Sequence, residues 1–152
     1  MLQSINIKLF SIVNSLNSSA FDTLFQMITY MGSGFVLIPV VIILYFINRE
    51  KIIPVLVSYL ISGAAAQVIK YLWSIPRPAA LLENVHVVGE VLYAGSFPSG
   101  HTVTAMALFY VLSNGQRPIV KITLLAIAIA IGYSRIYIGA HFPADVFGGA
   151  IL

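Results

Sequence analysis

The amino-acid sequence predicts an all-α membrane protein, a polytopic helix bundle of about five to six spans with an amphipathic helix at its N-terminus. The chain has 152 residues, of which 59% are apolar and only 9% are charged. Soluble domains carry about 25% charged residues. A chain of this length cannot bury so much apolar surface, so a bilayer is the expected solvent. We expect one membrane-embedded domain over residues 1–152.

The first segment, residues 1–16, is predicted to be an amphipathic helix that lies in the membrane interface. Polar residues interrupt it and no small-residue cleavage site follows, which argues against a signal peptide. Its apolar residues recur at helical spacing: Leu2, Ile5, Leu9, Ile12, Val13 and Leu16.

Four apolar stretches are predicted to span the membrane. They are residues 21–48, 51–73, 97–112 and 119–138. The segment Gly32-Ser33-Gly34 is expected to bend or break the first of them. A fifth span begins near His141, and we expect the sequence to end inside it, by truncation or by disorder beyond it.

The loops predict the orientation of these spans. Arg49-Glu50-Lys51 and the 114–121 connection are short and basic, and the positive-inside rule places such loops in the cytoplasm. The 74–96 and 139–143 connections are then extracytoplasmic. No basic run is long enough to bind nucleic acid. The chain has no cysteine, which excludes disulfides and thiolate metal sites.

Six ionisable residues near the ends of the predicted spans fall at the extracytoplasmic face. They are Lys70, Arg77, His101, Arg135, His141 and Asp145. Ionisable groups in membrane segments are costly and usually face a cavity. Cations and imidazoles that converge at one face predict a basic pocket, for which phosphate is the natural ligand.

Two local patterns add chemistry to this pocket. His141 and Asp145 are four residues apart and would share a face of a helix, where the carboxylate fixes the tautomer and frees the other ring nitrogen to attack. Pro98-Ser99-Gly100-His101 is typical of a helix start, with Ser99 as cap and Gly100 allowing close approach of an anion. Taken singly, each pattern also fits a plain helix start, a structural hydrogen bond or a snorkelling lysine.

The joint pattern resembles the type 2 phosphatidic acid phosphatase family, which also includes vanadium haloperoxidases and glucose-6-phosphatase. Its three parts are Lys70, six residues and Arg77-Pro78; then Pro98-Ser99-Gly100-His101; then Ser134-Arg135, five residues, His141, three residues and Asp145. The parts stand in order at the family's spacing over residues 70–145. Family members often have six spans, with a full span where this chain has residues 1–16.

The resemblance implies a role for each residue. His141 would be the nucleophile that forms a phosphohistidine, Asp145 would orient it, and His101 would be the general acid for the leaving lipid alcohol. Lys70, Arg77 and Arg135 would bind the phosphate oxygens, with Ser99 and the Gly100 amide completing the cradle. The resemblance implies no metal and no cofactor.

The expected activity is therefore metal-independent removal of phosphate from a membrane lipid at the periplasmic face of a bacterial inner membrane. The candidate substrates are lipid A 1-phosphate and undecaprenyl diphosphate, which we favour, and phosphatidylglycerol phosphate and phosphatidic acid. Two alternatives remain open, a lipid phosphotransferase that uses the same phosphohistidine and a non-enzymatic anion-binding membrane protein. The 79–96 loop is either a lid or a surface loop in the headgroups, and its His86 is predicted to be non-catalytic.

Overall fold

The computed structural model describes residues 2–152, and these form α-helices and short 3-10 turns without a β-strand. The α-helices are α1 (Leu2–Asn14), α2 (Ser19–Tyr30), α3 (Leu37–Ile47), α4 (Ile52–Leu72), α5 (Pro78–Leu81), α6 (Gly100–Ser113), α7 (Pro118–Tyr137) and α8 (Pro143–Ile151). The 3-10 turns are η1 (Gly34–Val36) and η2 (Arg49–Lys51). The all-α prediction is confirmed.

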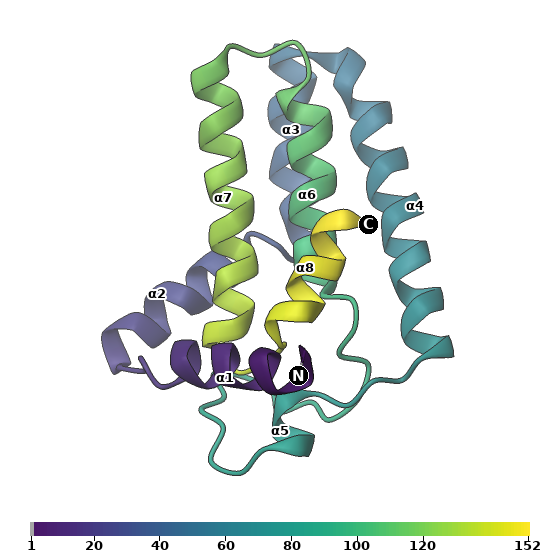
Figure 1. The fold of residues 1–152 in the computed structure, drawn as a ribbon. Coiled ribbons are helices and arrows are strands. Elements are labelled where there is room, and N and C mark those ends of the chain that lie inside the picture. Colours follow the sequence, from purple (N-terminus) through teal and green to yellow (C-terminus); the bar gives the residue numbers. More distant parts are fainter. Residues whose placement is uncertain (1) are drawn as a thin grey trace.

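Helix α6 lies at the centre of a bundle whose long helices run along one another (Figure 1). It packs against α7 on one side and against α4 on the other, and α8 also contacts it. This is why α6 is buried along most of its length, although it has only 14 residues. The outer helices α4 and α7 leave most of their apolar side chains exposed, as a helix in lipid does.

Two helical segments are long and apolar enough to cross a bilayer, Arg49–Leu72 and Pro118–Tyr137. A third candidate is the pair formed by α2 and the helix that follows it, which meet at an angle of 60°. The predicted bend at Gly32-Ser33-Gly34 is therefore confirmed. A Cβ atom on Gly32 would lie 2.6 Å from the Ile131 side chain and 3.0 Å from His101, so the break packs tightly against α6 and α7. These two or three spans leave the predicted number of five to six unconfirmed.

Helix α1 lies across one end of the bundle, beside the ends of α7 and α8 (Figure 1). The predicted apolar stripe faces outward: Leu2, Ile5, Leu9, Ile12 and Leu16 are exposed. On the opposite side of the helix Phe10 is buried against Phe142, with ring centroids 5.2 Å apart. The amphipathic helix is thus present, and Phe10 attaches it to the start of α8.

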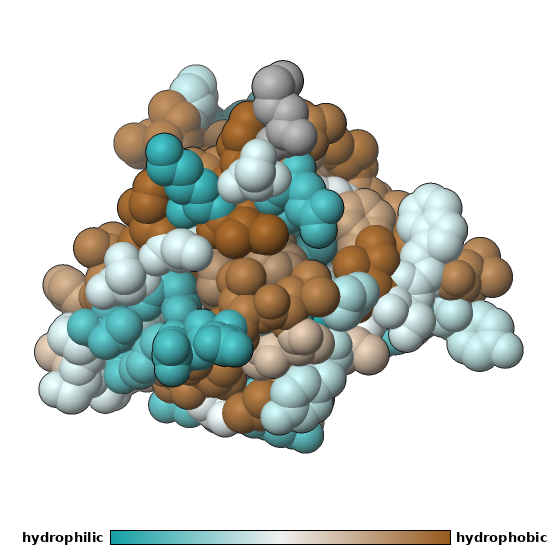
Figure 2. Space-filling model, turned by 60° about the horizontal axis from the view of Figure 1, so that its bottom comes forward, coloured by the Kyte–Doolittle hydropathy of each residue, from teal (hydrophilic) through white to brown (hydrophobic). Residues whose placement is uncertain are grey.

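The two ends of the bundle differ in character. At one end, Lys51 donates hydrogen bonds to the carbonyls of Leu112 and Asn114, at 2.8 Å and 2.6 Å, and so satisfies the last turn of α6. The other end holds α1, α5 and the long connection from α4 to α6. Figure 2 shows that hydrophilic and hydrophobic side chains are interleaved on this end. The predicted site residues all belong to this second end.

Candidate active site

His141 lies in the turn between α7 and α8. Gly139 has φ of +77°, a conformation that glycine adopts without strain, and it reverses the chain after α7. The backbone amides of Ala140 and His141 then both donate to the carbonyl of Arg135, each at 3.1 Å. These bonds fix the backbone of His141 against the last turn of the helix that carries Arg135.

His141 and Asp145 meet, but they do so by a geometry other than the predicted one. His141 precedes α8, which begins at Pro143, so the two residues do not share a helical face. Asp145 lies in the first turn of α8, and its Oδ2 accepts from the backbone amide of Phe142 at 2.9 Å. This capping contact turns the carboxylate back toward His141, whose Nδ1 lies 3.6 Å from Oδ2.

Asp145 has a second partner that the sequence did not reveal. The hydroxyl of Ser96, which is fully buried, donates to the same Oδ2. The backbone amide of Ser99 donates to the Asp145 carbonyl at 2.9 Å. The loop before α6 therefore holds Asp145 from two sides. Ser96 is a single serine in an irregular loop, and no periodicity or spacing marks it.

The imidazole of His141 is buried, with 2% of its surface exposed. This burial lowers the pKa of His141 to about 4; the Asp145 carboxylate opposes the shift, and the charges of Arg135 and Arg77 add to it. At neutral pH the ring is therefore uncharged. A neutral imidazole has one nitrogen with a free lone pair. With Nδ1 facing Asp145, the other nitrogen, Nε2, is the one available for attack.

Arg77 stands next to this nitrogen. Its Nη1 lies 3.4 Å from Nε2 of His141 and donates to the carbonyl of Ala140 at 3.1 Å. Its Nε donates to the carbonyl of Ala94 at 3.0 Å, and Nη2 reaches the carbonyl of Gly95 at 3.4 Å. Lys70, from the end of α4, donates to the same Gly95 carbonyl. Two of the three predicted phosphate-binding cations therefore meet at one residue of the loop.

Arg135 is the third cation and points inward from the last turn of α7. Its Nη1 donates to the hydroxyl of Thr29 on α2 at 2.7 Å, a partner that sequence spacing could not indicate. Its Nε is buried and has no hydrogen-bond partner among residues 2–152. A buried donor without an acceptor is costly, and a bound anion would satisfy it.

His101 lies between two cavities. One, of about 440 Å³, is also lined by Lys70 and Gly100. The other, of about 280 Å³, is also lined by Arg77 and Arg135. His101 thus connects the cavity lined by Lys70 with the cavity lined by Arg77 and Arg135.

The start of α6 differs from the prediction in one respect. Ser99 is the residue before the helix, as predicted, but its side chain makes no capping hydrogen bond. Its hydroxyl is fully buried and accepts from the Thr102 hydroxyl at 3.0 Å. Gly100 faces open space, with no atom within 4 Å of the position that a Cβ would take.

The 79–96 loop, predicted to be either a lid or a surface loop, lines the smaller cavity through several residues: Ala79, Val87, Val88, Gly89, Glu90 and Leu92. His86, from the same loop, lines neither of the two cavities. Its Nε2 lies 2.9 Å from the Asp22 carboxylate, and its backbone contacts Asn14. Within the described residues no group of three or more His, Cys, Asp or Glu side chains could hold a metal ion.

The site residues lie on segments that are far apart in sequence, from Lys70 to Asp145. A match to one known family covers all of them. Residues 51–152 match the PAP2 superfamily. The chain belongs to this superfamily. The resemblance inferred from the three motifs is therefore confirmed.

Relatives of this PAP2 chain have related names. It is 26% identical to an undecaprenyl-diphosphatase of Sulfolobus acidocaldarius over 97% of this chain and 72% of that protein. It is 41% identical to a lipid A 1-phosphatase of Rhizobium etli, over 36% of this chain and 23% of that protein. The chain spans 51% and 49% of the length of two relatives from Bacillus. The first two names agree with the predicted class of lipid phosphatase, whereas one of the Bacillus relatives is named a bacitracin transport permease.

The fold agrees with a solved structure as well. The crystal structure of Aquifex aeolicus LpxE superposes with a TM-score of 0.92 at 39% identity, over 97% of this chain and 88% of that one. Nearly the whole fold is thus shared with a solved protein of similar length.

Proposed function

We propose that this PAP2 protein hydrolyses a phosphomonoester or diphosphate of a membrane lipid through a phosphohistidine formed on Nε2 of His141. One observation carries the proposal. The imidazole is buried and neutral, its Nδ1 faces a capped carboxylate, and its Nε2 lies beside a guanidinium. This combination suits nucleophilic attack on a phosphorus atom whose oxygens are held by cations.

The first step forms the phosphoenzyme. The lone pair of Nε2 attacks phosphorus, the bond from phosphorus to the leaving oxygen breaks, and His101 gives that oxygen a proton. Asp145 stabilises the positive charge that develops on the His141 ring, because its Oδ2 faces Nδ1. In the second step His101 takes a proton from water, the water oxygen bonds to phosphorus, and the bond from phosphorus to nitrogen breaks.

The phosphate oxygens are proposed to bind Lys70, Arg77 and Arg135. The unpaired Nε of Arg135 and the open space at Gly100 support this placement. Ser99 is proposed to contribute by starting α6 at this point, so that backbone N–H groups of the first turn face the anion. No step of this mechanism uses a metal or cofactor.

The membrane arrangement follows the loop charges. We propose that residues 1–152 are one membrane-embedded domain in which α2–α3, α4, α6, α7 and α8 enter the bilayer. The basic connections at the Lys51 end are proposed to lie in the cytoplasm, and the site in the periplasm of a bacterial inner membrane. Lipid A 1-phosphate and undecaprenyl diphosphate are the favoured substrates, followed by phosphatidylglycerol phosphate and phosphatidic acid.

The test is phosphate release by purified protein in detergent with EDTA, using these four lipids. Release from at least one lipid is expected, with a loss of at least a thousandfold in His141→Ala, as when other catalytic nucleophiles are removed. His86→Ala is the matched control, since the His86 ring pairs with Asp22 on α2 and with none of the site cations. Equal release by His141→Ala and wild type would disprove the nucleophile assignment.

A labelling experiment separates hydrolysis from transfer. A ³²P-labelled lipid should give a protein label that is labile in acid and stable in base, present in wild type and His86→Ala but absent from His141→Ala. Labelling without phosphate release would identify a phosphotransferase that lacks its acceptor.

A further inference from the structure

The larger cavity beside the site runs from Lys70 into the bundle. It is lined by the α2–α3 break, one face of α4 and the first turns of α6. Its residues on α4 are Tyr59, Gly63, Ala66, Gln67 and Lys70. These positions recur every three to four residues and therefore form one stripe along the helix. The stripe begins at the site and leads toward the middle of the proposed bilayer.

Gln67 is the unusual member of this stripe. It lies one turn from Lys70, in a helix whose other exposed side chains are mostly apolar, such as Leu60, Ile61 and Val68. Its side chain makes no hydrogen bond within residues 2–152. A polar residue inside an apolar span is costly, and such residues mark substrate paths when they face a cavity.

The spacing along α4 matches the order of groups in a lipid phosphate. With a rise of 1.5 Å per residue, Gln67 lies roughly 4.5 Å beyond Lys70 along the helix axis, and Gly63 lies roughly 10 Å beyond it. A phosphate held by Lys70 would therefore have its next polar group near Gln67 and its hydrocarbon near Gly63. The surroundings agree, because Phe35, Ile38 and Val103 line this cavity and a Cβ on Gly63 would meet no atom within 4 Å.

We propose that Gln67 is a specificity-determining residue that hydrogen-bonds the polar group next to the scissile phosphate, while the slot at Gly63 receives the first part of the hydrocarbon chain. This inference rests on the proposed function and names the part of the substrate that the site recognises beyond the phosphate. An amide both donates and accepts hydrogen bonds. Its partner is therefore an oxygen-rich group, either a second phosphate or a hydroxyl of a sugar or glycerol.

The first experiment compares three single-chain substrates that differ in this group. Dodecyl phosphate has no polar group beside the phosphate, farnesyl diphosphate has a second phosphate, and lysophosphatidic acid has a glycerol hydroxyl. Gln67→Leu should lower kcat/KM on one or both of the latter about tenfold more than on dodecyl phosphate, since a hydrogen bond to a charged or polar group is lost. The substrate with the larger fall in kcat/KM identifies the group that Gln67 binds.

The charged variant Gln67→Glu distinguishes a phosphate partner from a hydroxyl partner. Gln67→Glu should lower kcat/KM on farnesyl diphosphate further than Gln67→Leu does if the partner is a phosphate, because the carboxylate repels it. If the partner is a hydroxyl, Gln67→Glu should stay closer to wild type than Gln67→Leu. Equal effects of Gln67→Leu on all three compounds would overturn the role of Gln67.

The second experiment tests the slot. Gly63→Leu should lower kcat/KM on dodecyl phosphate about tenfold more than on butyl phosphate, because the added side chain fills the path of the longer chain. Ala64→Leu is the matched control, since Ala64 is exposed on another side of α4. An unchanged ratio between the two alkyl phosphates in Gly63→Leu would overturn the slot.

The outcomes also separate this inference from the proposed function. If wild type releases phosphate and the substrate ratios do not respond to the α4 variants, only the inference fails. If wild type releases phosphate from none of the four compounds or the four lipids, the proposed function fails and the inference fails with it.

Discussion

At the scale of single residues, the geometry around Asp145 sets the direction in which His141 can react. Its Oδ2 receives the Ser96 hydroxyl and the Phe142 amide, and both contacts leave the carboxylate facing Nδ1 of His141. The carboxylate therefore has little freedom to rotate. Partners of this kind tune activity although they do not touch the substrate.

Ser96→Ala should lower kcat about tenfold with little change in KM, because one hydrogen bond to a charged group is lost while the phosphate-binding cations stay in place. Ser96→Thr keeps a hydroxyl and should recover most of the loss. The measurement is steady-state kinetics in detergent, with the thermal midpoint of each variant as a folding control. A uniform loss in both variants that follows the thermal midpoint would show that Ser96 acts only on folding.

The buried His141 also predicts a pH dependence of stability. Its pKa is about 4 in the folded protein, below its ordinary 6.5. Between these values the unfolded chain binds a proton that the folded one does not, so His141 makes the fold lose stability as pH falls from about 6.5 to about 4. Thermal midpoints across this range should fall more in wild type than in His141→Gln. Parallel curves would contradict the buried neutral state.

Most residues of the site could be predicted from sequence, because charged groups in an apolar chain are conspicuous and the three motifs have fixed spacings. Ser96 and Thr29 could not. Each is a common polar residue whose partner lies on another element, and only the fold brings them to Asp145 and Arg135. The predicted helical pairing of His141 with Asp145 failed because Pro143 starts the helix after His141.

At the scale of elements, α1 is attached to the site by a polar cluster as well as by Phe10. Asn14, at the end of α1, donates to the carbonyls of His86 and Tyr137, both at 2.8 Å, and accepts from the His86 amide at 2.9 Å. Tyr137 is the last residue of α7, and the turn that carries His141 follows it. The sequence predicted the helix from its apolar period, but an anchor formed by one buried asparagine leaves no periodic signal.

Asn14→Ala should therefore destabilise the protein by about 2 kcal/mol, because it leaves buried backbone groups unpaired. Activity should fall as well, since those groups flank the His141 turn. Asn17→Ala is the control: Asn17 is exposed and makes one hydrogen bond, to the neighbouring Asn14 carbonyl. Thermal denaturation in detergent measures both variants, and equal midpoints for the two would refute the anchor.

At the scale of the whole molecule, apolar length and loop charge predicted which segments form helices, but not how they pack. The sequence predicts α6 only as a short span. Its central position in the bundle depends on close contacts between segments. A Cβ on Gly149 of α8, for example, would lie 2.7 Å from the Ser99 carbonyl. Such close approach between segments fifty residues apart has no signature in a single sequence. The number of membrane crossings stays a prediction for the same reason, since α6 and α8 are shorter than a bilayer is thick.

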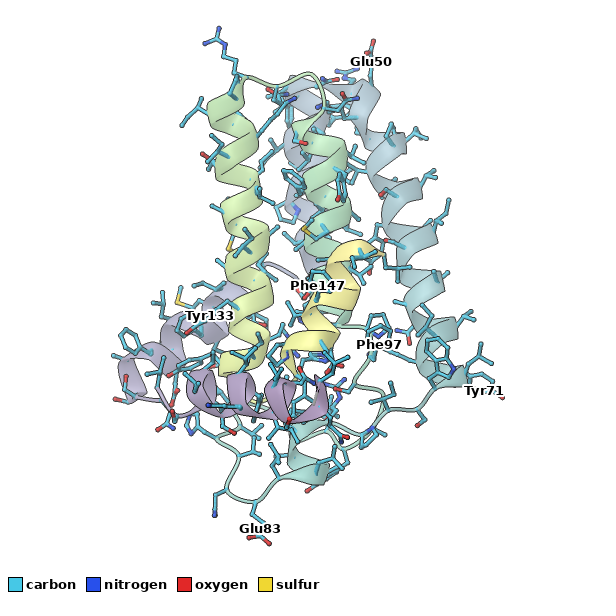
Figure 3. All side chains as sticks on the ribbon, viewed as in Figure 1. Glu50, Tyr71, Glu83, Phe97, Tyr133 and Phe147 are labelled. Carbon is cyan, nitrogen blue, oxygen red and sulfur yellow. The ribbon has the colours of Figure 1, made fainter. Side chains whose placement is uncertain are left out.

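The proposed orientation predicts the labelling of single cysteines. The sequence has no cysteine, so each introduced thiol is the only one. Glu83 and Glu50 point outward at opposite ends of the molecule (Figure 3). In intact spheroplasts a membrane-impermeant maleimide should label Glu83→Cys, whereas Glu50→Cys should react only after lysis. The reverse pattern would place the site in the cytoplasm.

The carbonyl of Gly95 accepts hydrogen bonds from both Lys70 and Arg77. This contact affects which membrane lipids can bind at the site. A bilayer offers the site a vast excess of ordinary phospholipid, whose phosphate is a diester with a single negative charge. A neutral carbonyl already occupies the two cations, and only a ligand that attracts them more strongly displaces it. A terminal phosphate with up to two charges meets that threshold better than a diester does. Both kinds of lipid must displace the resting contact with Gly95, and the terminal phosphate regains more from the two cations than a diester does.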